Sequence, residues 1–291
     1  MLTLGDLWLE FEQFYMAVRL RPSTVRGYRI NWTLHIVPFL SPTLPLSALS
    51  VRLLDELTVA LRKTGLSNRT ILYVHATLRK MLSFAVKRGY LASSPYGLVD
   101  LPRPERYRYS VLDENQIHRL LDLVVSDEIL RLPVTLALCY GLRRGEVLGI
   151  IPCSDLDFSS GILHIQRSRS QENGVPVITP CKTESGNRQI LLYPDHLRLF
   201  RDLKPDSFAC PLSPASLDVY FKRFLVQYGF PDVRFHDLRH SYATLMLAKQ
   251  VNPKIVCSVL GHSHVSVTLQ IYSHPDVSMQ SVCLNAFWPK K

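Results

Sequence analysis

The spacing of apolar residues predicts that the first hundred residues fold as a set of helices. The apolar-rich residues 7–18 predict the first helix. Ser23 and Ser50 stand where N-caps are expected, before helices predicted over residues 24–40 and 51–63. This part of the chain is therefore predicted to be helical throughout.

A further helix in this region has the clearest pattern. Ser67 is its predicted N-cap and Gly89 its predicted end. Between them, apolar residues recur at three- and four-residue spacing: Ile71, Val74, Leu78, Met81, Leu82 and Ala85. Five basic residues accompany this helix: Arg69, Arg79, Lys80, Lys87 and Arg88. They either contact phosphates or form the solvated face of the helix.

The helical pattern breaks between residues 93 and 109. Prolines at positions 95, 102 and 104 remove helical hydrogen bonds, and basic residues stand among them. We interpret residues 101–110 as a linker between a helical domain over 1–100 and a second domain over 111–291. An internal loop is the alternative.

The second domain contains both helices and strands. Residues 113–116 have a capping-box arrangement, and helices continue to Gly149. Strands are predicted over residues 162–166, 175–178 and 189–192, with the first two flanking a turn at 172–174. Asn173-Gly174 is typical of a hairpin turn, and Pro176 argues that the second strand is short or lies at an edge. Helices are predicted again over about 216–228, 236–249, 253–259 and 266–273. The predicted fold class is mainly α with a small antiparallel β-sheet.

Composition favours a folded protein of two domains. The chain has 291 residues, of which 47% are hydrophobic, enough for two separate cores. It contains no apolar run of about 18 residues, so no membrane span is expected. Its first residues do not resemble a secretory signal. Six scattered cysteines, without a CxxC pair, are typical of thiols in a reducing cytoplasm.

The net charge is +10 and favours a polyanionic partner. Residues 1–110 contain 15 Lys or Arg and 7 Asp or Glu, so they carry +8 of this total. The remainder of the chain carries only +2. This distribution favours an N-terminal domain that grips DNA and a second domain whose basic residues are specialised. A generic basic protein is the alternative.

Six side chains in the second domain suggest phosphate chemistry. A guanidinium offers a planar fork of donors that matches two phosphate oxygens. A tyrosine, with a pKa of about 10, becomes a nucleophile only in a cationic site with a base nearby. The residues are Arg143, Lys182, His236, Arg239, His262 and Tyr272. This set predicts an enzyme that cuts and rejoins DNA.

These residues stand in four short motifs that resemble those of the tyrosine recombinase (phage integrase) family. The motifs are GLRRGE at 141–146, a lysine hairpin around Lys182, HDLRHSYAT at 236–244, and LGH at 260–262 followed by TLQIYSH at 268–274. Each is weak alone, but their order makes the resemblance specific over residues 113–274. The resemblance implies the family's two-domain architecture.

The resemblance assigns the phosphate clamp to Arg143, rather than to Arg144, and to Arg239. Without it, Arg143 reads as a surface arginine. Glu146 lies on the same helical face as Arg143 and would orient and neutralise it, or form an ordinary helix salt bridge. His236 is expected to accept the tyrosine proton or to donate to a phosphate oxygen.

The remaining assignments rest mainly on motif context. His262 is expected to donate to the phosphate, Lys182 to protonate the leaving 5′ oxygen, and Tyr272 to attack. His236 and His240 have the i, i+4 spacing of metal ligands, but Asp237 replaces the glutamate of zinc proteases. We therefore expect His240 to be structural. His264 and His274 are expected to be surface residues.

Several properties follow from the resemblance. Energy is kept in a 3′-phosphotyrosine ester, so neither metal nor other cofactor is expected. The implied partner is double-stranded DNA, bound by a homotetramer on two sites, with accessory DNA-bending or directionality proteins possible. An integrase of a phage or mobile element is the expected role. The chain begins directly with the helical domain, which indicates either simple sites, as for Xer-type recombinases, or a shortened form.

Two other functions and one structural question stay open. A catalytically silent DNA-binding relative and a type IB topoisomerase-like enzyme are the alternative functions. The last residues carry apolar positions at roughly helical spacing: Val277, Met279, Val282, Cys283, Ala286 and Phe287. This tail either docks on a neighbouring protomer or packs on its own domain.

Overall fold

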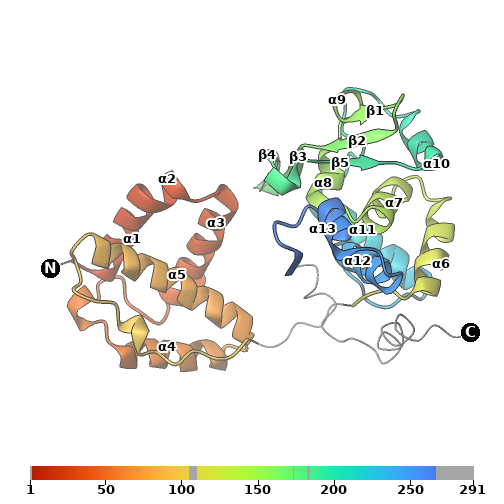
Figure 1. The fold of residues 1–291 in the computed structure, drawn as a ribbon. Helices are drawn as coiled ribbons and strands as arrows, with labels where there is room; N and C mark the ends of the chain where they lie inside the picture. Colours follow the sequence, from red (N-terminus) through yellow and green to blue (C-terminus); the bar gives the residue numbers. More distant parts are fainter. Residues whose placement is uncertain (1, 105–109, 173, 182–183, 267–291) are drawn as a thin grey trace, which may run out of the picture. The chain divides into compact units, whose positions relative to one another are not determined.

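The chain forms two compact units, Met1–Tyr107 and Arg108–Lys291. The computed structural model describes residues 2–104, 110–172, 174–181 and 184–266 (Figure 1). Residues 105–109, in the predicted linker, lie outside this description, as does the tail after residue 266.

The first unit is built of helices in its described part. Two of the predicted N-caps are confirmed, since the side chains of Ser50 and Ser67 accept hydrogen bonds at the starts of their helices. The predicted cap at Ser23 is wrong: Arg21 has the extended backbone of an N-cap and Pro22 opens the helix, because its fixed φ suits the first turn. The elements are α1 (Leu4–Phe11), α2 (Ala17–Arg19), α3 (Pro22–Ile30), α4 (Val51–Lys63) and α5 (Asn68–Lys87), with π-helical segments Glu12–Met16 and Asn31–Ile36 and 3-10 turns Leu46–Ala48 and Pro95–Gly97.

The core of the first unit lies between α5 and the other helices. The apolar positions predicted for α5 are all buried there. His75 is a buried polar group within this core: its Nε2 lies 2.9 Å from Thr58 Oγ1, and its Nδ1 lies 2.9 Å from Tyr96 Oη. Burial lowers the pKa of His75 to about 4, so the ring is neutral near pH 7.

The second unit combines helices with short strands. The predicted capping box is confirmed, because Asp113 and Gln116 exchange side-chain and backbone hydrogen bonds at the start of α6. The helices are α6 (Glu114–Val124), α7 (Arg131–Cys139), α8 (Arg144–Gly149), α9 (Pro152–Asp155), α10 (Pro194–Leu197), α11 (Pro214–Gln227), α12 (Asp237–Ala248) and α13 (Pro253–Leu260), with 3-10 turns Glu184–Gly186 and Arg198–Phe200.

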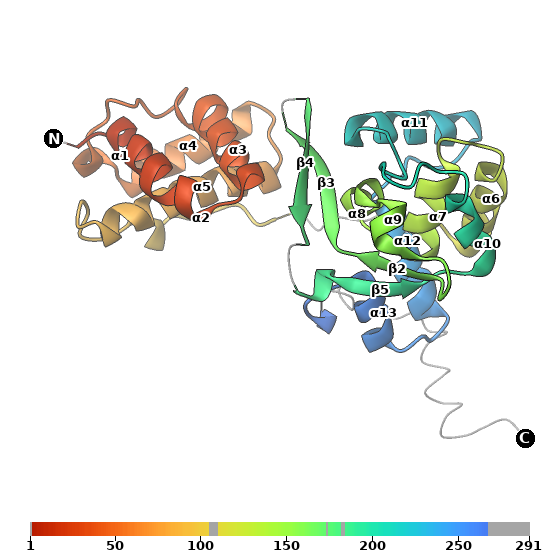
Figure 2. The ribbon, with the colours of Figure 1, turned by 90° about the horizontal axis from the view of Figure 1, so that it is seen from above.

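The described strands form two separate antiparallel sheets. The first has the order β1 (Leu156–Asp157), β2 (Ile162–Ile165), β5 (Arg188–Leu191). The second is a ribbon of β3 (Arg167–Glu172) and β4 (Val175–Pro180) that extends beyond the helices of this unit (Figure 2).

The predicted pairing of the first two strands is wrong. The strand that pairs with β4 is the polar β3, whereas β2 pairs with β1 and β5. Sequence patterning missed β3 because its residues, RSRSQE, lack apolar alternation. Glu172 pairs with Val175, as a two-residue hairpin connection requires.

The apolar core of the second unit joins the site-bearing segments. Packed residues from α6, α7, α11 and α12 form one cluster, and the first sheet packs with residues of α7 and α8 in another. A third cluster joins α12 to α13. Within the described ranges, no helix is long and apolar enough to cross a lipid bilayer.

Candidate active site

Arg143 is the N-cap of α8 and lines the cleft described below. It follows Gly141, whose φ of +64° is suited to glycine and whose missing Cβ would meet Tyr242 and Leu260. The Arg143 backbone N–H donates to Glu146 Oε2 at 2.9 Å, and its Nη1 donates to Glu146 Oε1 at 2.6 Å. The side chain is still 36% exposed, so its guanidinium is fixed yet accessible.

Glu146 is the buried carboxylate of the site, with a side chain only 3% exposed. Arg188 donates to both of its oxygens, at 3.1 and 2.9 Å. Burial raises the pKa of this carboxyl, but the hydrogen bonds and charge of Arg188, and then the charge of Arg143, overcome this and lower the pKa to about 2. The carboxylate is therefore ionised at neutral pH and shared by two arginines.

Arg239, on α12, is 3% exposed. Its Nη1 donates to Gly141 O and its Nη2 to Leu260 O, both at 2.7 Å. Burial, followed by the nearby charge of Arg143, lowers the pKa of Arg239 to about 9. The group stays protonated at neutral pH, and the two carbonyls hold it without cancelling its charge.

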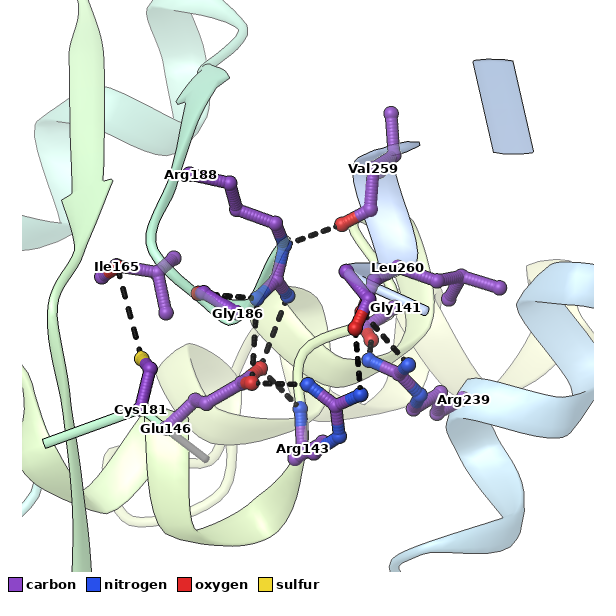
Figure 3. Close-up of polar contacts among 11 residues, drawn as sticks. Gly141, Arg143, Glu146, Ile165, Cys181, Gly186, Arg188, Arg239, Val259 and Leu260 are labelled. Atoms are coloured by element: carbon purple, nitrogen blue, oxygen red, sulfur yellow. Dashed lines mark hydrogen bonds and ion pairs between the residues drawn. The ribbon is translucent and has the colours of Figure 1, made fainter. Parts of the chain in front are cut away.

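The C-terminal end of α13 connects all three guanidinium groups (Figure 3). The last carbonyls of a helix lack partners within it and carry partial negative charge. Here each of three consecutive carbonyls accepts from a different arginine: Val259 O from Arg188 Nε at 2.5 Å, Leu260 O from Arg239 Nη2 at 2.7 Å, and Gly261 O from Arg143 Nη2 at 2.9 Å. One helix end thus sets the positions of three cations.

His236 precedes α12 and is exposed at the edge of the site. Partial desolvation, and then the charge of Arg239, lower its pKa, so the ring is neutral near pH 7. His240 lies one turn on, half-buried, with its ring centroid 5.4 Å from that of His236. Burial and then His236 lower the pKa of His240 to about 4. In the described part of the chain, no three His, Cys, Asp or Glu side chains are placed to hold a metal ion.

His262 directly follows the end of α13. Gly261 has a φ of +63°, which ends the helix and redirects the chain, and the His262 backbone N–H then donates to Cys257 O at 3.1 Å. Burial, followed by the charges of Arg239 and Arg143, lowers the pKa of His262 to about 4. Its imidazole is therefore a neutral group close to both arginines.

A cleft of about 630 Å³ opens beside Arg143 and His236. Its other charged lining residues are Arg144, Lys222, Arg234, Asp218 and Asp232. Arg144 forms an ion pair with Asp218, and both residues line the cleft. Of the neighbouring arginines 143 and 144, Arg143 forms the ion pair with Glu146.

The structure brings Arg143, Glu146, Arg239, His236 and His262 together around the start of α8 and the end of α13. Lys182 and Tyr272 lie outside the described residues, so their predicted roles stay predictions.

Sequence reasoning assigned no role to Arg188. A signal was present, because alternation places Arg188 on the same face of β5 as the buried Ile190, where a charged residue is unusual.

Comparison with known proteins gives the same family for most of the second unit. Residues 110–279 match the model described as the Phage integrase family. The chain is 27% identical over 241 residues to tyrosine recombinase XerC of Yersinia pestis, covering 79% of this chain and 76% of that protein. It is 29% identical over 280 residues to tyrosine recombinase XerC of Shewanella amazonensis, covering 92% and 91% respectively.

Solved structures share the fold. The Tn1549 transposon integrase, in complex with transposon right end DNA, has a TM-score of 0.83 at 20% identity, covering 98% of this chain and 99% of that one. A lambda integrase dimer bound to a COC′ core site has a TM-score of 0.72 at 20% identity, covering 94% and 98%. These likenesses confirm the predicted fold class.

Proposed function

The chain belongs to the phage integrase family of tyrosine recombinases, and on that premise we propose that it cleaves and rejoins double-stranded DNA through a 3′-phosphotyrosine at Tyr272. Membership makes it a tyrosine-type site-specific recombinase. The finer role that we propose is that of an integrase of a phage or mobile element. The fold it shares with the Tn1549 transposon integrase agrees with that role.

The surplus positive charge of the arginine cluster is the observation that best supports this function. Arg143, Arg188 and Arg239 carry three positive charges, and Glu146 is the carboxylate they share, which leaves a net charge of +2 over these four side chains. A phosphodiester carries one negative charge, and the pentacoordinate transition state of its cleavage carries two. The cluster therefore matches the transition state better than the ground state, as catalysis requires.

The proposed reaction uses the other site residues for proton transfer. The Tyr272 oxygen attacks phosphorus, and the phosphorus–O5′ bond breaks. His236, neutral in the DNA-free site, accepts the phenolic proton. Lys182 gives a proton to the leaving O5′, while Arg143, Arg239 and His262 hold the nonbridging oxygens. The 5′-hydroxyl of a partner strand then attacks the phosphotyrosine, which rejoins the backbone and releases Tyr272.

The first unit is proposed to hold the duplex. Lys80 is exposed on α5 and Arg88 is exposed at its C-cap. Aromatic rings hold both charges in place: Lys80 Nζ lies 5.3 Å from the ring centre of Tyr15, and Arg88 Cζ lies 5.2 Å from that of Phe84. Preordered cations suit phosphate contacts because less side-chain entropy is lost on binding.

We propose assembly as a homotetramer on two DNA sites in the cytoplasm, with accessory DNA-bending or directionality proteins. A lambda integrase tetramer bound to a Holliday junction shares the fold and supports this assembly. In this assembly, the tail after residue 275 would dock on a neighbouring protomer; its packing on its own domain is the alternative.

The deciding experiment uses nicked duplexes built from the DNA that flanks the gene. The protein is incubated with them in the presence of a chelator, and a denaturant-resistant protein–DNA adduct is measured. We expect an adduct with the wild-type protein and none with Tyr272→Phe. Specific binding without an adduct would instead indicate a silent DNA-binding relative, and relaxation of plasmids without a site would indicate a topoisomerase-like enzyme.

A further inference from the structure

Arg188 occupies a junction between three segments of the second unit. Its side chain is 7% exposed. It donates to both oxygens of Glu146 on α8, to Val259 O at the end of α13, and to Gly186 O just before β5 at 3.2 Å. One guanidinium therefore ties the start of β5 to α8 and α13, two of the elements that carry the candidate site (Figure 3).

We propose that Arg188 is a positioning residue for strand cleavage, which holds Arg143 in place through Glu146 and holds the end of α13 through Val259 O. The inference rests on the proposed roles of Arg143 and His262 in binding the scissile phosphate. Arg188 itself does not touch the reacting atoms in this scheme.

The first link is the Glu146 carboxylate. Each of its oxygens accepts two hydrogen bonds, one from Arg143 and one from Arg188. The planar fork of Arg188 thereby sets the plane of the carboxylate. Without Arg188, Arg143 alone would neutralise a buried carboxylate. The carboxylate would then be held only by its two contacts with Arg143, so its plane and the Arg143 guanidinium would be less fixed, and the cluster would lose one of its two surplus charges.

The second link is the close packing of the α13 end. A Cβ added to Gly261 would lie 2.6 Å from Ser185 O and 3.0 Å from Arg188 Nη1. The end of α13 is thus pressed against the turn that leads into β5. Because His262 follows Gly261 directly, any shift of this contact moves a residue of the proposed phosphate site.

The test compares neutral and conservative variants of Arg188 in the full chain. Single-turnover adduct formation on a nicked duplex should slow by on the order of 100-fold in Arg188→Met, since small misplacements cost about that much. DNA affinity should change by less than about threefold, because Arg188 does not contact DNA in this proposal. Arg188→Lys should recover only part of the rate, since an ammonium lacks the fork that spans both carboxylate oxygens.

Arg167→Met is the matched control. Arg167 forms an ion pair with the buried Asp155 at 2.8 Å in the same unit, and its guanidinium donates to Ser154 and Asp155. Its adduct rate should stay close to that of the wild type. Wild-type adduct rates in Arg188→Met would overturn the inference, as would equal losses in Arg188→Met and Arg167→Met. If Arg188→Met does not fold, Arg188→Lys carries the same comparison.

A second readout needs neither DNA nor catalysis. Carboxyl carbon NMR of the DNA-free protein should show the Glu146 pKa well below its usual range in the wild type and raised in Arg188→Met, because the strongest lowering contact is gone. A wild-type protein that forms no adduct dependent on Tyr272 would count against the proposed function. An unchanged Glu146 pKa in Arg188→Met would overturn the role of Arg188 separately.

Discussion

The guanidinium groups of the site are held mainly by backbone carbonyls. Arg239 donates to Gly141 O and Leu260 O, and Arg143 combines Gly261 O with the single carboxylate Glu146. Carbonyls fix a cation's position without removing its net charge. The cost is that the site depends on the exact path of the backbone where α13 ends.

Gly261 gives a residue-scale prediction about that path. Gly261→Ala should lower the free energy of unfolding by more than the roughly 1–2 kcal/mol that a φ of +63° costs a residue with a Cβ, because the Cβ would also lie 2.6 Å from Ser185 O. It should also slow adduct formation, since the new methyl group would displace Ser185 O or Arg188 from contact distance. Chemical unfolding and single-turnover adduct assays measure the two effects.

Gly229→Ala supplies the control for conformation alone. Gly229 has a φ of +66°, and an added Cβ would meet no atom within 4 Å. It should lose only the roughly 1–2 kcal/mol of the backbone conformation and keep the wild-type rate of adduct formation. Equal rates in both variants would contradict the importance of the Gly261 contact.

At the scale of elements, the position of α5 is specified by local sequence, whereas the environment of one of its side chains is set by other segments. The Ser67 cap and the apolar spacing define it, and both were visible in sequence. His75 could not be interpreted that way. Its ring is fully buried, and this burial keeps it neutral, while Thr58 and Tyr96 from other segments supply the hydrogen-bond partners of its two nitrogens.

His75 therefore predicts an acid sensitivity of the first unit. The folded pKa is about 4, below the ordinary value of 6.5. As pH falls below 6.5, the unfolded chain binds a proton that the folded unit excludes. The stability of the folded unit therefore falls between pH 6.5 and pH 4, and His75 does not affect it above pH 6.5. Between pH 7 and 4.5, the wild type should lose roughly 2–3 kcal/mol more than His75→Gln in chemical unfolding. Parallel losses in the two proteins would contradict this.

At the scale of the whole molecule, the charge is divided between the units. Residues 1–110 carry +8 of the net charge of +10, and in the second unit three arginines and Glu146 place a charge of +2 at one site. We expect the first unit to supply affinity through phosphate contacts and the second to supply chemistry.

This division predicts the salt dependence of DNA binding. Replacing Lys80 and Arg88 by Gln should reduce the slope of log affinity against log salt by about 2, because each removes one phosphate contact. Arg52→Gln is the control, since Arg52 is exposed but paired with Glu56. Binding titrations at several salt concentrations measure the slopes. An unchanged slope in the double variant would place the DNA on another face.

The sequence by itself determined the helices with strong caps, such as α4, α5 and α6, because a cap and an apolar period act within a few residues. It also determined the family, because the order of short motifs is a property of the chain. The pairing of β3 with β4 needed the tertiary structure, since polar strands carry no apolar alternation to indicate their partners. The role of Arg188 needed it too. Its partners lie 42 and 71 positions away, and only folding brings Glu146 and Val259 to one guanidinium.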